Sequence, residues 1–567
     1  MKSTLGWKRR WTLFCALLAL VCAMSSTVFA APLGGTTPTD YWIGQGDADL
    51  SILDNSRNYG RISSVAMGDL NGDGQADLVL GAPYAYAVQS TGAPAGMVYV
   101  IYSGFNPSNN MTLDLTLRPG RGTHASVSSL AYPGGTSPTV AGYQIAGEVA
   151  GMRFGAAVAC GDFNGDGVAD LAVAAPRRLT SQVAGRVYLI MGDPSMRYMS
   201  DLQALRQYNR LITIVGPNRS ADLSFGDHLL LFDFNGDGRD DLVIGSPAAG
   251  TGGEAHILYG GDFSGEILGA DQIPASDERF VIITAPETKL GFGAALAAGD
   301  LTGDGLPDLI VGAPLADRSG ADSGEVYVFS GSDPASSPPL LTRVTDPVSA
   351  ATLRVVGPNA NEAFGSALAV GDFDGNGFGD LAIGAPFASL STMSSAGKLY
   401  LLYNDDPTTA QRVITPDPSQ PDVAVFIGPA TGSRLGSAAA LGRFDDDSLA
   451  DLMIGAPEIQ PPGGETIRGA VFAVLGRAPA ERPRGEIILN DWGGIVRADL
   501  TIWAGDSGDR LGHSLALRQF DGLRGSDLLV CGNPTSEGRA GSAWLFLGRT
   551  PTTTVILSAR PSWTLYR

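Results

Sequence analysis

The apolar residues of this chain gather in short runs of five or six, separated by segments rich in Gly, Asp, Asn and Pro. Runs of this length between turn-forming residues predict β-strands. Some are apolar at nearly every position, such as Asp170-Leu171-Ala172-Val173-Ala174, and these predict strands buried on both faces. No long stretch beyond the N-terminus keeps a 3.6-residue period, so we expect few helices.

An acidic segment, first seen as Gly68-Asp69-Leu70-Asn71-Gly72-Asp73-Gly74-Gln75-Ala76-Asp77-Leu78, recurs along the chain. The last Asp of each copy falls at positions 77, 170, 241, 308, 380, 451 and 527. Fixed-period self-similarity marks a repeat architecture. The chain therefore contains seven units of about 70 residues, and the first carries an insertion at roughly 106–141.

Each unit has two further landmarks on either side of its acidic segment. An aromatic residue or Leu followed by Gly opens it: Tyr59-Gly60, Phe154-Gly155, Phe225-Gly226, Phe292-Gly293, Phe364-Gly365, Leu435-Gly436 and Leu511-Gly512. A Gly-Ala-Pro triplet or a variant ends its second strand: Gly81-Ala82-Pro83, Ala174-Ala175-Pro176, Gly245-Ser246-Pro247, Gly312-Ala313-Pro314, Gly384-Ala385-Pro386, Gly455-Ala456-Pro457 and Gly532-Asn533-Pro534.

Two more strands complete each unit, which makes four short strands joined by turns. Such a unit predicts one antiparallel sheet. Radial stacking of the sheets buries the inner strands on both faces and leaves only short edges. The predicted fold is therefore an all-β, seven-bladed β-propeller of four-stranded antiparallel blades with calcium loops.

The acidic segments carry the candidate metal chemistry. With their first Asp as position one, oxygen-bearing side chains recur at positions one, three, five and nine, and Gly recurs at position six in five copies. Oxygen ligands in this number suit calcium, with the carbonyl of position seven as a further ligand. The predicted ligands are Asp69, Asn71, Asp73, Gln75 and Asp77; Asp162, Asn164, Asp166, Val168 and Asp170; Asp233, Asn235, Asp237, Arg239 and Asp241; Asp300, Thr302, Asp304, Leu306 and Asp308; and Asp372, Asp374, Asn376, Phe378 and Asp380.

An EF-hand is the obvious rival, but it needs Glu at position twelve and flanking helices. Position twelve is apolar in all five copies and lies in a predicted strand. In the sixth copy, Arg443 replaces the first Asp, and in the seventh Gln519 and Leu523 replace positions one and five. We expect about five structural calcium ions, none in the seventh copy and weak or no binding in the sixth, where Arg443 could pair with carboxylates instead.

The Phe-Gly and Gly-Ala-Pro landmarks around a calcium loop resemble the FG-GAP repeat of integrin α-subunits and of glycosylphosphatidylinositol-specific phospholipase D. The resemblance spans about residues 49–548. It implies the same seven-bladed propeller, with partners bound on the face opposite the calcium loops. It also implies that 50–53 closes the last blade as its outer strand, although 554–557 competes for that place.

The N-terminal segment predicts export from the cell. Residues 1–30 combine a basic start, an apolar run and a small-residue cleavage pattern, which is typical of a signal peptide. We divide the rest into an N-terminal linker (31–48), the propeller (49–548) and a C-terminal tail (549–567). Cleavage would move the formal charge from −20 to −24, which disfavours nucleic acid as a partner. No later run could span a membrane, so we expect a secreted or cell-surface monomer.

Motifs for catalysis are missing from the sequence. No Gly-x-Ser-x-Gly, His-Glu-x-x-His or phosphate-binding Gly-rich loop occurs. We interpret His228, His256 and His513 as packing or edge residues, and Cys160 and Cys531 as separate thiols rather than a disulfide. The leading hypothesis is a non-catalytic recognition or adhesion module for an extracellular protein or glycan. The alternatives are a polysaccharide lyase or hydrolase, which should show a pocket with a perturbed acid or base, and a purely structural repeat protein.

Overall fold

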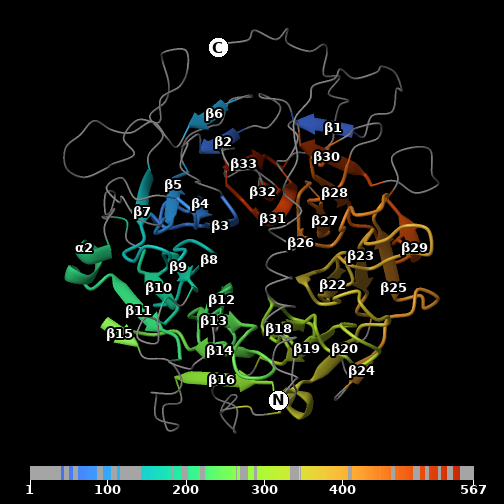
Figure 1. Cartoon of the computed structure of the whole chain (residues 1–567), viewed down its shortest axis with the longest axis horizontal. Coiled ribbons are helices and arrows are strands. Elements are labelled where there is room, and N and C mark those ends of the chain that lie inside the picture. The colour runs from blue at the N-terminus through green and yellow to red at the C-terminus, as the bar shows by residue number, and fades with distance from the viewer. Residues whose placement is uncertain are drawn as a thin grey trace.

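The computed structural model shows a ring of seven sheets around a central axis (Figure 1). The structure describes residues 40–43, 50–54, 62–85, 94–103, 111–114, 142–177, 179, 184–192, 194, 202–217, 224–263, 265–267, 279–285, 290–331, 344, 346–405, 412–445, 447–460, 466–489, 498–504, 510–520, 525–532 and 541–548. The predicted signal peptide, the C-terminal tail and the pair Tyr59-Gly60 lie outside these ranges.

Every blade is an antiparallel sheet of four consecutive strand positions, as the repeat predicted. The inner strands of blades one to seven are β3 (Ser64–Gly68), β8 (Val158–Gly161), β12 (His228–Phe232), β17 (Ala295–Gly299), β21 (Ala367–Gly371), β26 (Ala438–Gly442) and β31 (Leu511–Arg518). The second strands are β4 (Asp77–Ala82), β9 (Asp170–Ala175), β13 (Asp241–Ser246), β18 (Asp308–Ala313), β22 (Asp380–Ala385), β27 (Asp451–Ala456) and β32 (Asp527–Gly532). Each second strand begins at the ninth-position Asp of its acidic segment.

The third strands are β5 (Met97–Ile101), β10 (Arg186–Ile190), β14 (Glu254–Leu258), β19 (Glu325–Phe329), β23 (Lys398–Leu402), β28 (Ala470–Val474) and β33 (Gly541–Phe546). The fourth strands are β7 (Gly142–Ala146), β11 (Leu211–Val215), β16 (Phe280–Thr284), β20 (Leu353–Val356), β25 (Val423–Ile427), β30 (Leu500–Ala504) and, in blade seven, β2 (Leu50–Asp54). Because β2 pairs antiparallel with β33, a strand from the N-terminal part closes the ring. The competing segment 554–557 lies outside the described residues.

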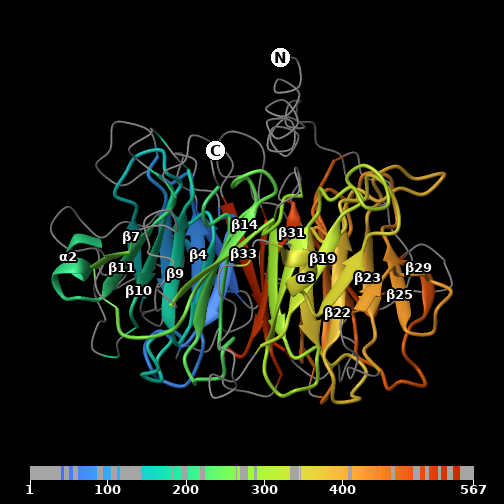
Figure 2. The ribbon, with the colours of Figure 1, turned by 90° about the horizontal axis from the view of Figure 1, so that it is seen from below.

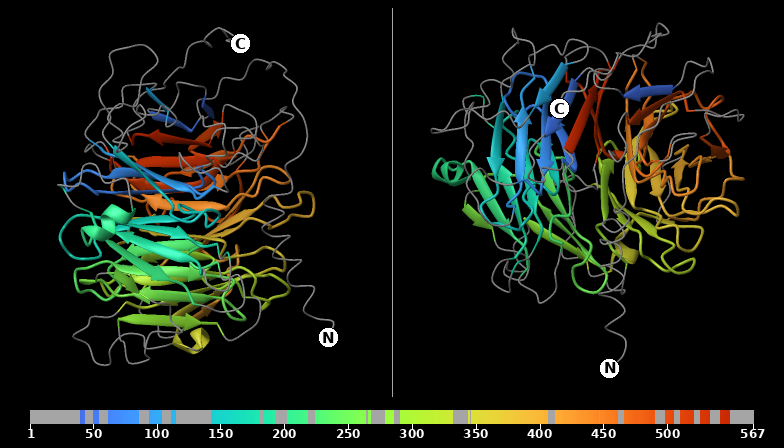
Figure 3. Two further views of the ribbon diagram at one scale, coloured as in Figure 1. Left: turned by 60° about the vertical axis from the view of Figure 1, so that its left-hand side comes forward. Right: turned by 45° about the horizontal axis from the view of Figure 1, so that its top comes forward.

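Within the described parts of the chain, five blades carry a fifth, parallel edge strand that the sequence did not predict. These strands are β15 (Gly265–Ile267), β24 (Arg412–Ile414), β29 (Gly485–Ile488), β1 (Asp40–Ile43) and β6 (Met111–Asp114). Each comes from the segment that leads into one blade's fourth strand, and it pairs with the fourth strand of the preceding blade. Two of them fall in unexpected places: β1 lies in the predicted linker, and β6 in the insertion of the first unit. These pairings tie neighbouring blades together at the outer rim, where Figure 1 labels the five edge strands. Figure 3 shows the same ring from two further sides.

Apolar packing lies between blades rather than within one. Among the described residues, seven buried clusters each combine side chains from two adjacent blades. The described helices, α2 (Leu202–Gln207) and α3 (Pro347–Ala350), sit at the periphery (Figures 1 and 2). No helix among the residues that the structure describes has the length and apolar character needed to cross a bilayer.

The two repeated glycine landmarks meet at the contact between blades. A Cβ added to Gly312 of blade four would lie 2.1 Å from the carbonyl oxygen of Gly365 in blade five. The same approach recurs at Gly81, Gly245, Gly384 and Gly455, where that distance is 2.1–2.3 Å. Since no carbon can approach an oxygen so closely, the motif is a close-packing device between neighbouring inner hairpins.

We therefore expect Gly312→Ala to destabilise the propeller by about 3 kcal/mol, because the blades must separate to admit one methyl group. Thermal unfolding in calcium measures the loss. Blade two already has Ala174 at this position, so Ala174→Gly is the matched control and should cost less than about 1 kcal/mol. Equal losses in both variants would contradict this account of the motif.

Candidate functional site

The acidic segments connect the inner to the second strand of each blade, so the topology gathers them on one face of the ring. Glycine, Asx-type turns and backbone amides shape them. In blade one, the carboxylate of Asp69 accepts from the backbone N–H of Asp73 at 3.0 Å and of Gly74 at 2.7 Å. Gly74 has φ +86°, a conformation that favours glycine. The first-position Asp accepts from the position-six N–H in all five complete copies.

The ninth-position Asp has a second structural role in every blade. One oxygen of Asp170 accepts from the N–H of Phe163 at 2.9 Å, and the other accepts from Gly192 at 2.8 Å, just beyond the third strand. The same pair of bonds occurs at Asp77, Asp241, Asp308, Asp380, Asp451 and Asp527. This residue therefore ties three strands together whether or not a metal is bound.

The predicted ligands have the chemistry that a hard cation needs. In blade five, one carboxylate oxygen each from Asp372, Asp374 and Asp380 lies within 4.8 Å of the others, and Asp374 and Asp380 are buried. Burial raises the pKa of Asp380 to about 7, and nearby Asp374 and Asp372 act in the same direction. Three crowded carboxylates in a site of oxygen donors match the ligand preference of calcium.

The fifth loop also has a partner that the sequence did not predict. Arg482 is buried and donates to Asp374 and, at 2.7 Å, to both oxygens of Asp405. Its guanidinium lies 4.2 Å from the centre of the Tyr403 ring. The sequence contains one hint of this partner. Position three is Asn or Thr in the other four complete loops but Asp374 in the fifth, and the charge of this additional carboxylate is paired with Arg482.

The sixth and seventh loops keep the ninth-position Asp and its backbone bonds but lack the first-position Asp. In the sixth, Asp445 and Asp447 still accept backbone N–H bonds from Asp447 and Leu449, whereas Arg443 at position one is exposed. In the seventh loop, position five lies outside the described residues. Asp527 at position nine accepts the same two backbone hydrogen bonds as its counterparts in the other blades. Weak or no metal binding in the sixth loop and no metal in the seventh stay predictions.

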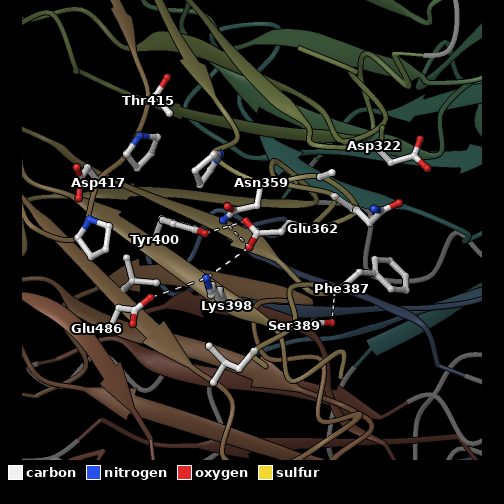
Figure 4. Close-up of a pocket in the computed structure, with 18 of the residues that line it drawn as sticks. Asp322, Asn359, Glu362, Phe387, Ser389, Lys398, Tyr400, Thr415, Asp417 and Glu486 are labelled. Atoms are coloured by element: carbon white, nitrogen blue, oxygen red, sulfur yellow. Dashed lines mark hydrogen bonds and ion pairs between the residues drawn. The ribbon is translucent and has the colours of Figure 1, made fainter. Parts of the chain in front are cut away.

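A pocket of about 1260 Å³ opens between blades four and five, away from the acidic loops (Figure 4). Its walls come from the connections β20–β21, β22–β23 and β24–β25, and from Glu486 on β29. Two charged side chains lie at its base: Glu362 is 3 % exposed and Lys398 is 7 % exposed. Lys398 Nζ lies 3.4 Å from Glu362 Oε1, and the Tyr400 hydroxyl donates to Glu362 Oε2 at 2.8 Å.

Glu362 distinguishes blade five from the other blades that open with Phe. The residue two positions before the opening Phe is buried Met152 in blade two and buried Leu290 in blade four. Blade five places a carboxylate there, and Asn359 also donates to it at 3.0 Å. Sequence reasoning missed this site because Glu362, Lys398 and Tyr400 are brought together only by the fold.

His256 and the described cysteines fit the packing roles expected of them, whereas His228 is exposed at the start of β12. His256 is fully buried on β14, with its ring 5.3 Å from Phe225. Cys160 and Cys531 are free thiols, and burial raises the pKa of each to about 12. His513 lies on inner strand β31, where burial and the charge of Arg510 lower its pKa to about 4.

The shift at His513 predicts a pH effect on stability. An imidazole with a pKa near 6.5 when unfolded and about 4 when folded binds more protons in the unfolded state between those values. Its contribution is therefore present above pH 6.5 and is lost as the pH falls to 4. We expect wild type to lose more stability across this window than His513→Gln, measured by denaturant unfolding. Parallel losses would contradict the assignment.

Comparison with known proteins agrees with this architecture. The fold and loops define a class, a seven-bladed β-propeller with acidic inner hairpins. The FG-GAP repeat model matches residues 62–101, 154–190, 225–259, 292–329 and 364–402, which are the inner three strands of blades one to five. The chain thus carries FG-GAP repeats, as its landmarks predicted, and these are the blades with complete acidic loops.

The relatives include both kinds of protein that the motifs resembled. Phosphatidylinositol-glycan-specific phospholipase D of Bos taurus is 28 % identical over 400 residues, covering 70 % of this chain and 43 % of the relative. The Homo sapiens protein of the same name is 29 % identical over 407 residues with the same coverage. Integrin alpha pat-2 of Caenorhabditis briggsae is 31 % identical over 241 residues, covering 41 % of this chain and 18 % of the relative. The chain therefore spans less than half the length of these relatives.

Proposed function

We propose that this protein is a secreted, calcium-stabilised recognition module that binds an extracellular protein or glycan without transforming it. The observation that carries the proposal is the pocket between blades four and five, with a buried Glu362–Lys398 pair at its base. Burying two charges costs free energy that an apolar pair would not. A buried carboxylate retained where the other blades that open with Phe have Met or Leu is therefore best explained by a ligand.

Similarity to integrin α-subunits supports recognition, and the acidic loops support calcium as a structural ion in five blades. Asp, Asn and Thr side chains at positions one, three, five and nine would hold each ion, which would join the two inner strands and neutralise the clustered carboxylates. The apolar N-terminal run supports export, and the net charge of −20 argues against nucleic acid. The ring closed by its own β2 strand supports a monomer.

A secreted enzyme acting on polysaccharide is the second candidate, because the pocket contains a Tyr, a Glu and a Lys in contact. The chemistry of Tyr400 favours binding over catalysis. Burial and the charge of Glu362 hold the pKa of Tyr400 well above its ordinary value. Its proton is already directed at Glu362, so the phenol cannot readily act as a base at neutral pH.

The test is to present the secreted chain to a glycan array and to a panel of purified extracellular proteins, with millimolar calcium and with excess chelator. We expect saturable binding in calcium that disappears with chelator. The eluted ligand should be chemically unchanged by mass spectrometry. Shortened or unsaturated glycan products would instead establish the enzyme, and absence of any binding would reject recognition.

A further inference from the structure

One residue that lines the pocket, Val425, differs from its counterpart in blade four. Tyr327 and Tyr400 occupy the same position of their third strands, and their partners across the sheet are Arg354 and Val425. In blade four, Arg354 lies 5.7 Å from the Tyr327 ring centre and pairs with Glu325. Val425 is too short to fill the equivalent space, so the region beside Tyr400 stays open as part of the pocket.

The base of this space offers hydrogen-bonding groups of both signs. The Lys398 ammonium has three donors, yet its contacts to Glu362 and Glu486 are long, at 3.4 and 4.0 Å. Glu362 has about four acceptor positions, and three donors approach it, from Asn359, Lys398 and Tyr400. The pair is therefore desolvated, but neither group has its hydrogen-bonding capacity filled.

The Lys398–Glu362 pair at the base of the pocket disfavours a ligand group that carries a net charge. An anion that reached Lys398 would face Glu362 and Glu486, and a cation that reached the carboxylates would face Lys398. A hydroxyl can accept from the ammonium and donate to a carboxylate at once. Phe387 and several prolines add apolar surface to the walls, side chains of Ser, Thr, Asn and Gln add neutral hydrogen-bonding groups, and Asp322 and Asp417 add two further carboxylates. At about 1260 Å³ the space exceeds that of a typical small-molecule site.

We propose that the pocket between blades four and five binds an uncharged oligosaccharide, with hydroxyl groups bridging Lys398 and Glu362. The inference rests on the proposed recognition function and names the ligand class of that site. In this proposal Val425 keeps the site open, and Lys398 and Glu362 form the hydrogen bonds to the hydroxyl groups.

The experiment is calorimetric titration of the secreted, calcium-loaded chain with neutral hexasaccharides: cello-, malto-, xylo-, manno- and N-acetylated chitohexaose. We expect at least one to bind. Lys398→Met and Glu362→Gln should each weaken that binding by about ten-fold or more, because a hydrogen bond to a charged group is lost. Val425→Arg should abolish it by filling the space as Arg354 does in blade four.

Tyr327→Phe is the matched control, because it removes the Tyr–Glu hydrogen bond of blade four, outside the pocket; binding should stay within about two-fold. Melting curves of each variant separate misfolding from loss of the site. If Val425→Arg fails to fold, Glu362→Gln still tests the site, because glutamine has the same shape as glutamate. Failure of every hexasaccharide to bind would overturn the inference, as would tighter binding of a hexalysine or heparin hexasaccharide probe. A protein partner bound equally by wild type and Glu362→Gln would leave recognition standing but remove this pocket from it.

Discussion

Excess chelator will lower the melting temperature of this propeller by about 12 °C. Five sites, each filled at one hundred times its dissociation constant, would stabilise the native state by about 13 kcal/mol in total. Unfolding the propeller, 49–548, has an entropy of about 1 kcal/mol/K, so that loss corresponds to about 12 °C. Differential scanning calorimetry in millimolar calcium and in chelator measures the shift.

The cause of this effect is the crowding of fifteen predicted ligand carboxylates in five short loops, three such ligands in each. Without a cation they repel each other, and the ninth-position residues are also buried. A variant with Asp162→Asn and Asp166→Asn should show a smaller calcium-dependent shift, since one of five sites is lost. An identical melting curve with and without chelator would reject calcium as a structural ion.

The sequence sufficed to predict the blades because their signals are local and repeated. Continuous apolar runs such as Asp308–Ala313 become second strands buried along their whole length. The glycine landmarks marked the units in the sequence, and the structure adds the reason for glycine at positions such as Gly312, where two blades approach too closely for a Cβ. Five complete acidic loops likewise stand out from the two that have lost their first Asp.

Features that depend on a neighbouring blade were not predictable in the same way. The edge strand β15 has only three residues, and its pairing comes from the fourth strand of the preceding blade rather than from its own propensity. Arg482 reaches Asp374 across 108 residues of sequence. The pocket requires Val425 opposite Tyr400 on the neighbouring strand, and Glu362 from a separate loop. The fold brings these residues together, and no spacing in the sequence indicates it.

Asp527→Ala should destabilise the propeller by about 4 kcal/mol to the same extent in calcium and in chelator. Asp527 is 1 % exposed and accepts from the N–H groups of Phe520 and Gly548. Alanine leaves both buried donors unpaired, at about 2 kcal/mol each. Denaturant unfolding in both conditions measures the loss, and Asp527→Asn, which keeps one acceptor oxygen, should recover part of it.

The matched variant is Asp170→Ala in blade two, which removes the same two backbone bonds and also a predicted calcium ligand. It should therefore cost more in calcium than in chelator, whereas Asp527→Ala should not. If the effect of Asp527→Ala fell sharply in chelator, the seventh loop would bind metal despite Gln519 at its first position. Equal behaviour of the two variants in calcium and chelator would instead show that the ninth-position Asp acts only as a backbone tie, and that Asp170 is not a calcium ligand of the second loop.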